Sequence, residues 1–176
     1  NQAAEAFEQK LKDERIALKQ QIWVNLFSAN KIVNDYELAL VKGKLPDLAD
    51  QALLQTQAQT QIDAITQWPS GGLKAIQQKL ARANGSADLT ENLNALRELC
   101  IRADILTDSV TPASEQALRT AFQVNQLQQN FGRKTQDAIS EFENHVFEWI
   151  GVGAVDAKDY EPLFARFNTC RLKAAN

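Results

Sequence analysis

The side chains of this sequence that could do chemistry are few and widely spaced. His145 is the single histidine, and Glu141 lies four residues before it, so one face of a helix could carry both side chains. A carboxylate beside an imidazole can orient a general base for catalysis. Because no nucleophile is specified near this pair, the sequence favours an ordinary surface or boundary histidine.

Carboxylate pairs occur in the same region, but they lack the partners that a metal ion needs. Glu141 and Glu148 are seven residues apart. Helical carboxylate sites for two metal ions usually take a Glu-x-x-His pair from each of two helices, and this chain has one histidine. Cys100 and Cys170 are far apart in the sequence, and we expect both to be free, buried hydrophobic residues. The sequence predicts no metal site and no cofactor.

The glycines do not form a phosphate-binding loop. Gly151-Val152-Gly153 follows the end of a predicted helix, whereas a dinucleotide-binding glycine loop follows a strand. Phosphate-loop lysine, nucleophilic serine and metalloprotease helix patterns do not occur in the sequence. We therefore predict that the protein is not an enzyme. Tightly bound zinc or nucleotide in the purified protein would support the alternative.

Three arginines could bind an anion. Arg97, Arg102 and Arg119 belong to two predicted central helices and could hold a phosphate or a partner's carboxylate through paired hydrogen bonds. Alternatively, they pair with neighbouring carboxylates on a solvated face, such as Asp104 and Glu115. The net charge is −3, without the basic character that is typical of a nucleic-acid module. These arginines are therefore weak candidates for binding phosphate or a partner.

The composition favours helices. The chain has 176 residues, of which 44% are hydrophobic and 23% charged, so it can bury a core. It contains 25 Ala, 20 Leu and 18 Gln, which are good helix formers, but only 7 Gly and 4 Pro. Apolar periodicity and helix-ending residues predict helices over about 3–41, 47–67, 73–83, 90–106, 112–131, 134–150 and 159–173. The predicted fold class is all-α, with a long N-terminal helix and a bundle or array of about six shorter helices.

Individual residues set the expected bounds and the expected core. Pro46 and Gly132 separate neighbouring helices, and Thr90 is the expected N-cap of the fourth helix. We expect all three tryptophans in the core. The apolar side chains of the fifth helix are also expected to point inward; they are Ala117, Leu118, Ala121, Phe122, Val124, Leu127 and Phe131.

The first predicted helix is too long for the others to cover. About 39 residues span roughly 58 Å, whereas a compact domain of this size has a radius of gyration near 16 Å, as a rough estimate. Phe7, Leu11 and Leu18 form a narrow apolar strip on the charged first half of this helix, as in a coiled-coil seam. We expect this strip to contact another chain. In the alternative, the helix kinks near Ser28 and folds back, which buries the strip.

The chain is expected to divide into three parts. Residues 1–45 form the long, partly protruding helix, residues 46–88 form a helical pair with features of a degenerate repeat, and residues 89–176 form a C-terminal helical bundle. The two tryptophans Trp68 and Trp149, which each precede a glycine-containing break, support the idea of a repeat.

The C-terminal part resembles a known kind of repeat. Trp149 and Gly151 end one predicted helix, and Arg166-Phe167 lies in the next. This pattern resembles the Trp-x-x-Gly … Arg-Phe repeat of a bacterial family of long helical proteins whose domain is classed as of unknown function. The resemblance covers about residues 89–173. It implies packing roles for these four residues and implies no activity.

Taken together, the sequence predicts a non-catalytic helical interaction or scaffold module at the end of a longer repeat protein. Its expected partner is another protein, other repeats of a parent chain or a second copy bound through the N-terminal helix. The expected location is the cytoplasm, and no apolar run is long enough to span a membrane. The alternative is an accessory nucleic-acid or ribonucleoprotein-binding module, whose binding would weaken steeply with added salt.

Overall fold

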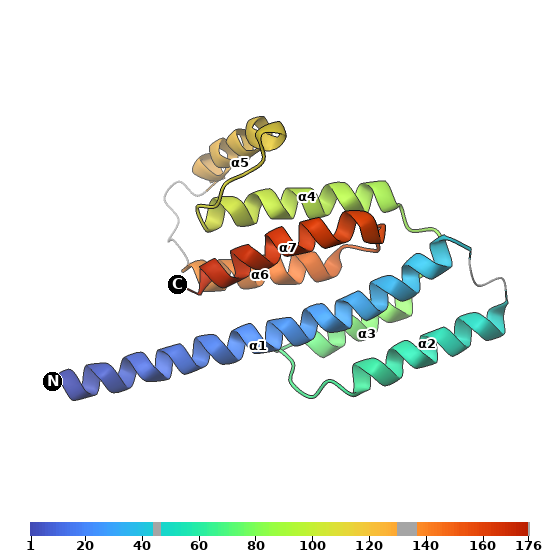
Figure 1. Ribbon diagram of the computed structural model, residues 1–176, viewed down its shortest axis with the longest axis horizontal. Coiled ribbons are helices and arrows are strands. Elements are labelled where there is room, and N and C mark those ends of the chain that lie inside the picture. The colour runs from blue at the N-terminus through green and yellow to red at the C-terminus, as the bar shows by residue number, and fades with distance from the viewer. Residues whose placement is uncertain (44–46, 130–136, 176) are drawn as a thin grey trace. The chain divides into compact units, whose positions relative to one another are not determined.

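The chain folds into helices throughout the parts that the computed structural model describes, residues 1–43, 47–129 and 137–175 (Figure 1). The helices are α1 (Gln2–Val41), α2 (Leu48–Asp63), α3 (Gly72–Arg82), α4 (Leu89–Leu106), the 3-10 turn η1 (Ala113–Glu115), α5 (Gln116–Gln129), α6 (Ala138–Gly151) and α7 (Ala157–Ala174). These described ranges contain no strand. The predicted all-α class, with a long first helix and six shorter ones, is confirmed.

The chain divides into two compact units, residues 1–85 and 86–176. In the first unit, α1 packs against both α2 and α3, so the long helix does not stand apart from the helical pair that follows it. In the second unit, α4 contacts α5, α6 and α7, and α6 also contacts α7. The second unit is therefore assembled around α4.

Helix α1 is one uninterrupted helix of 40 residues, which corresponds to about 60 Å. Asn1 caps it, because its side-chain oxygen accepts a hydrogen bond from the Ala3 amide at 3.0 Å. At the other end Gly43 has a φ of +64°, a left-handed conformation that glycine adopts without strain. Since α1 continues through Ser28, the helix does not fold back there, and that alternative is wrong.

The core of the first unit lies along the C-terminal half of α1. Leu26 and Val33 on α1 are fully buried, as are Ile62 on α2 and Ile76 on α3. Leu26 lies against the start of α3, because a Cβ atom placed on Gly72 would be 3.5 Å from Leu26 Cδ1. Spacings of three, four and seven residues put these α1 side chains on one face.

Helices α2 and α4 start at aspartate caps. Asp47 caps α2, and its carboxylate accepts from the Ala49 amide at 2.8 Å. The predicted cap of the fourth helix is wrong: Asp88, not Thr90, accepts from the Thr90 and Glu91 amides at 3.1 and 3.0 Å. An aspartate two residues earlier already satisfies these free amides, so α4 begins at Leu89.

The core of the second unit is a stack of aromatic rings from α6 and α7. Phe167 lies between Trp149 and Phe142, with ring-centroid distances of 4.4 and 5.0 Å and stacked geometry on both sides. All three rings are buried. Tyr160 and Phe164 extend the cluster, stacked on each other at 5.6 Å. Large flat surfaces that exclude water in this way supply much of a small unit's stability.

Two expectations about the core are wrong. No side chain of α5 is buried: Leu118, Val124 and Leu127 are 41%, 50% and 76% exposed, because the main contacts of this helix are with α4 and η1 alone. Trp68 is half-buried at the end of α2, where its indole N–H donates to the Ile65 carbonyl oxygen at 3.0 Å. Four residues with expectations attached lie outside the described ranges: Pro46, Phe131, Gly132 and Lys134.

The stack makes Phe167 the most consequential aromatic side chain of the second unit. We expect Phe167→Ala to lower the free energy of unfolding by about 3–5 kcal/mol, because it removes a buried ring and leaves a cavity between two others. Leu127→Ala, at a side chain of α5 that is 76% exposed, is the control and is expected to change stability by less than about 0.5 kcal/mol. Urea unfolding followed by circular dichroism measures both, and equal effects would contradict the stacking argument.

Candidate functional site

The apolar face of α1 is covered along only part of its length. Leu26 and Val33 are buried, whereas Phe7, Leu11 and Leu18 are 61%, 37% and 55% exposed. At about 100° per residue, Phe7, Leu11 and Leu18 share one line along α1, and Leu26 and Val33 lie about 60–80° further around the helix from Leu18. In Figure 1, the N-terminal part of α1 extends beyond both α2 and α3. We call Ala4, Phe7, Leu11 and Leu18, all exposed, the uncovered strip.

The strip has the form of a surface for another helix. Its side chains recur at three, four and seven residues, which is the pattern of a coiled-coil seam. It is narrow, and the side chains beside it are charged and exposed, namely Glu8, Lys10 and Arg15. A helix that packed here would bury the apolar strip and leave the charges at the edges of the contact.

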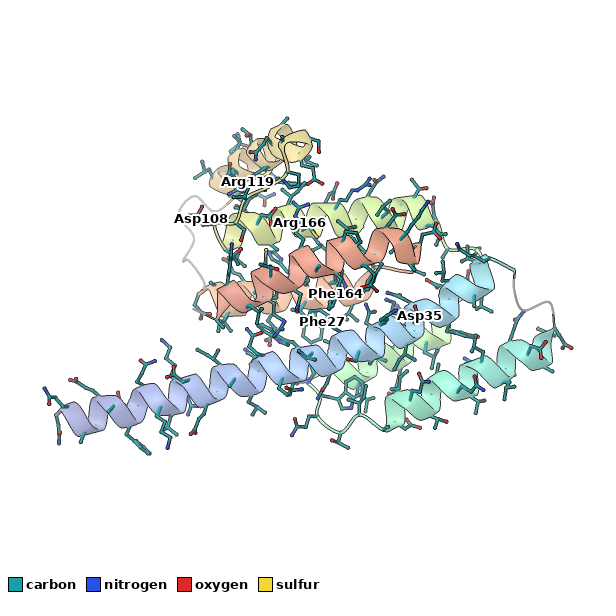
Figure 2. All side chains as sticks on the ribbon, viewed as in Figure 1. Phe27, Asp35, Asp108, Arg119, Phe164 and Arg166 are labelled. Atoms are coloured by element: carbon teal, nitrogen blue, oxygen red, sulfur yellow. The ribbon has the colours of Figure 1, made fainter. Side chains whose placement is uncertain are left out.

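Charged side chains of the second unit form a separate cluster around Arg166 on α7, a residue that Figure 2 labels. Its Nε donates to Asp104 Oδ2 at 3.1 Å, and its Nη1 donates to Glu115 Oε2 at 2.8 Å. Asp104 is 1% exposed and also accepts from the Thr111 hydroxyl at 2.9 Å. Burial lowers the pKa of Arg166, but the hydrogen bonds to the two carboxylates raise it more, so this guanidinium stays charged.

This cluster joins three elements that are distant in the sequence. Arg166 on α7 bonds to α4 through Asp104 and to η1 through Glu115. Two carboxylates face one guanidinium, and both oxygens of the buried Asp104 accept from protein donors, as a buried charge requires. The sequence pattern marked Arg166 only as one member of an Arg-Phe pair. Its charged partners lie 62 and 51 residues away, so no local signal could identify them.

The three arginines proposed for anion binding are not brought together. Arg102 pairs with Glu148 on α6, and Arg119 donates to the Ser109 carbonyl oxygen and to the Thr111 hydroxyl. Both guanidiniums are therefore engaged within the second unit, although with partners other than the expected neighbours. Arg97 is exposed on α4.

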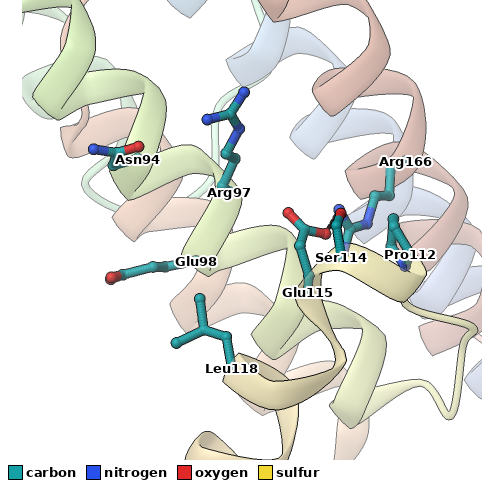
Figure 3. A pocket seen from close by; sticks show the side chains of 8 residues that line it. All are labelled: Asn94, Arg97, Glu98, Pro112, Ser114, Glu115, Leu118 and Arg166. Carbon is teal, nitrogen blue, oxygen red and sulfur yellow. Dashed lines mark hydrogen bonds and ion pairs between the residues drawn. The ribbon is translucent and has the colours of Figure 1, made fainter.

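A pocket of about 640 Å³ lies beside Arg97 (Figure 3). It is lined by Asn94, Arg97, Glu98, Pro112, Ser114, Glu115, Leu118 and Arg166. Two arginines face two glutamates there, and Arg166 already bonds to Glu115, so the lining carries no excess of positive charge. The pocket therefore lacks the electrostatic character of a phosphate site.

The histidine and the cysteines occupy buried or half-buried positions. Burial, followed by the nearby Arg102 guanidinium, lowers the pKa of His145, so the ring is neutral at pH 7. Its Nδ1 atom is buried, and among the described residues it has no hydrogen-bond partner, Glu141 included. Cys100 and Cys170 are free and buried, as expected, and burial raises the pKa of Cys100 to about 12. Neither thiol is activated as a nucleophile.

Within the described ranges, no group of three or more His, Cys, Asp or Glu side chains is placed to hold a metal ion. Within the same ranges, α1 to α7 include no helix with both the length and the apolar character that crossing a membrane requires. Searches of protein families, curated proteins and solved structures find no match to this chain. The resemblance to a bacterial helical-repeat family, with its packing roles for Trp149 and Gly151, therefore stays a prediction.

The first unit has a half-buried amine with unusual protonation. Lys79 on α3 donates from its Nζ to Asn30 Oδ1 on α1, and Asn30 is fully buried. Burial lowers the pKa of Lys79 to about 7, and the Glu37 carboxylate opposes this shift. Glu37 also accepts from the Asn84 amide at 3.4 Å. This polar contact fixes α3 against α1.

The Arg166 cluster predicts that the single substitution Asp104→Asn strongly lowers stability. Asp104→Asn removes the charge that compensates the guanidinium, so we expect the free energy of unfolding to fall by about 3 kcal/mol. Asp108→Asn is the matched control. Asp108 is exposed with a φ of +53°, a conformation that asparagine tolerates, so we expect less than about 0.5 kcal/mol. Thermal or urea unfolding measures both; a silent Asp104→Asn would show that the cluster does not stabilise the unit.

Lys79 predicts a pH dependence of stability. Its pKa is about 7 in the folded protein and near the ordinary 10.5 when unfolded, so between these values the unfolded chain binds more protons. Stability should therefore rise with pH in this window, by about 2 kcal/mol from pH 7 to about pH 9. Urea unfolding across this range measures the slope. Lys79→Met, which cannot titrate, should lose this contribution; an unchanged slope in the variant would assign it to other groups.

Proposed function

We propose that the protein is a non-catalytic helical interaction module that binds another helix through the uncovered strip of α1. One observation carries the proposal. Apolar side chains of α1 are buried in the first unit at Leu26 and Val33, but are exposed at Phe7, Leu11 and Leu18, which form a line of their own on the adjoining side of the helix. When helices of the same chain cover the apolar residues of a helix for only part of its length, the exposed apolar residues are suited to bind another chain.

The energetics of a long helix support this assignment. Isolated helices are marginally stable in water, and most helical stability in proteins comes from packing of an apolar face. Residues 2–18 carry the exposed strip over about 25 Å of the helix that precedes the buried part. A partner helix that covered Leu11 and Leu18 would remove their side chains from water and contribute about 25 cal/mol for each Å² buried.

The charges of α1 favour a protein partner over a nucleic acid. Residues 2–22 carry four cations and four anions: Lys10, Lys12, Arg15 and Lys19 against Glu5, Glu8, Asp13 and Glu14. A surface for nucleic acid concentrates positive charge to neutralise phosphates. In the second unit, Arg102 and Arg119 already bond to other groups of the protein. The nucleic-acid alternative thus has little support.

The wider setting of the module belongs to the same proposal. A partner can be a separate protein or another part of a longer parent chain that has further helical repeats. Two buried free cysteines are compatible with a reducing compartment, and we propose the cytoplasm as the location.

Two substitutions on the strip test the function. Leu11→Glu together with Leu18→Glu should abolish association with partner proteins, because it places charges on the seam, while the helical content and the midpoint of unfolding stay unchanged. Leu53→Glu, on the exposed side of α2 at 59% exposure, is the matched control and should keep every partner. The comparison uses quantitative co-purification of full-length variants at low and high salt.

The outcomes are distinct. If the double variant unfolds the protein, the strip is part of its own core and the proposal fails. If partners are kept by the double variant, or are lost from both variants equally, the strip is not the binding surface. Binding that falls steeply with added salt would favour the nucleic-acid alternative.

A further inference from the structure

We propose that the partner helix on the uncovered strip is α1 of a second copy of this chain, paired antiparallel over residues 4–21. This inference rests on the proposed function, because it uses the same surface. It commits to one partner and one direction. Both follow from the charges that flank the strip.

Heptad positions can be assigned from the exposed apolar residues. With Leu11 and Leu18 at position a, Ala4 also falls at a, and Phe7 falls at d. Glu14 and Gln21 occupy the remaining d positions. The charged residues that flank the seam are then Glu8 and Arg15 at e and Lys10 at g, and all three are exposed. Flanking e and g charges set the choice of partner and its orientation in coiled coils.

Several side chains outside the strip already make contacts within the chain. Gln9 and Asp13 are at positions f and c, away from the seam, and the Gln9 side-chain amide donates to Asp13 Oδ1 at 2.8 Å. The partly buried residues Ile16, Lys19 and Gln20 also lie outside the a and d positions. The strip is therefore the face of this segment that is open to a new helix.

A parallel pair is opposed by its charges. In a parallel coiled coil, the g position of one helix faces the e position five residues later on the other. Lys10 would then face Arg15 of the second copy, and the contact would occur twice because the pair is symmetric. Reversing one helix exchanges its two edges, so that e faces e and g faces g.

Only one antiparallel register pairs the flanking charges favourably. When Phe7 packs beside Leu18 of the second copy, Glu8 lies within about 3 Å along the axis of Arg15 of the second copy. The reciprocal pair forms by symmetry. Glu14, the charged residue in the seam, then lies beside Lys10 of the second copy, which can compensate its carboxylate. The uncharged Gln21 lies at the end of the seam, beside Ala4 of the second copy.

The neighbouring registers bring like charges together. If Phe7 packs beside Leu11 of the second copy, then Glu8 faces Glu8 and Lys10 faces Lys10 of the two copies. A shift of one heptad in the other direction brings Arg15 opposite Arg15. Like charges at the edge of a helix pair are destabilising. The charge pattern therefore selects the register in which Phe7 and Leu18 meet.

The antiparallel arrangement also fits the covered part of α1. Residue 23, where the buried face begins, would lie beside residue 2 of the second copy. The α2 and α3 helices of the two copies are thus at opposite ends of a contact about 30 Å long, where they do not compete for space. Only two apolar layers contain large side chains on both helices, so the dimer should be weak and dependent on concentration.

Charge reversal at Arg15 separates the two directions. Sedimentation of the full chain over a range of concentrations should give a monomer–dimer equilibrium. In the antiparallel pair, Arg15→Glu replaces two attractions by two repulsions and should weaken dimerisation about ten- to thirtyfold. The double variant Glu8→Arg with Arg15→Glu should restore it to within about threefold. Lys12→Glu, at the outer b position, makes the same change in charge and should have little effect.

Cross-linking tests the direction independently. Ala4→Cys and Gln21→Cys variants, mixed under oxidising conditions, should form a mixed disulfide dimer, because residues 4 and 21 meet in the proposed register. Ala4→Cys alone should not cross-link, since its two copies would be about 25 Å apart along the axis. The unsubstituted chain, whose two cysteines are buried, is the control.

Each result decides the inference without deciding the proposed function. A monomer at all concentrations, a dimer that is insensitive to Arg15→Glu, or a tighter dimer of that variant would overturn antiparallel pairing. Tightening would indicate parallel helices, because Lys10 would then face a glutamate. If partner proteins are still lost on Leu11→Glu with Leu18→Glu in any of these cases, the strip binds a different helix and the proposed function stands.

Discussion

The apolar side chains of α1 extend further along the helix than α2 and α3 can cover. Helix α1 has 40 residues, whereas α2 and α3 have 16 and 11, so they correspond to about 60, 24 and 17 Å. Their apolar residues, such as Ile62 and Ile76, are buried in the unit that includes the C-terminal half of α1. Exposed apolar residues continue along α1 at Leu18, Leu11 and Phe7, on the adjoining side of the helix. Rigid helical geometry thus links the core of the first unit to the surface that we assign to binding.

The second unit is held together in a different way, because its helices are short and each is stabilised by contacts with the others. Stacked rings from α6 and α7 provide the apolar part, with Phe167 between Trp149 and Phe142. Arg166 provides the polar part and connects α7 to α4 and η1. These adjacent residues of α7, Arg166 and Phe167, therefore hold the ionic and the aromatic cluster together. Substitutions that disturb either should affect the whole unit.

Side chains whose types could support catalysis or anion binding are instead buried or bonded to other groups of the protein. The pKa of His145 is lowered, and both cysteine thiols have raised pKa values. Arg102 and Arg119 bond to groups of their own unit. The surface that we assign to a partner is the uncovered strip with its balanced flanking charges. A protein that recognises another helix needs little beyond such a seam, because burial supplies affinity and edge charges supply specificity.

The sequence by itself determined the helices, their order and the strip. Helical periodicity and caps are local: Asp47 precedes α2 by one residue, and the spacing of Phe7, Leu11 and Leu18 fixes their common face. Which faces are covered was decided by tertiary structure. Leu127 and Ile76 fit equally regular apolar patterns, yet one is 76% exposed and the other buried. The partners of Arg166 and the pKa of Lys79 were also beyond local patterns, because they depend on helices that meet only after folding. Spacing limits which side chains share a face, but only packing between distant elements decides what that face meets.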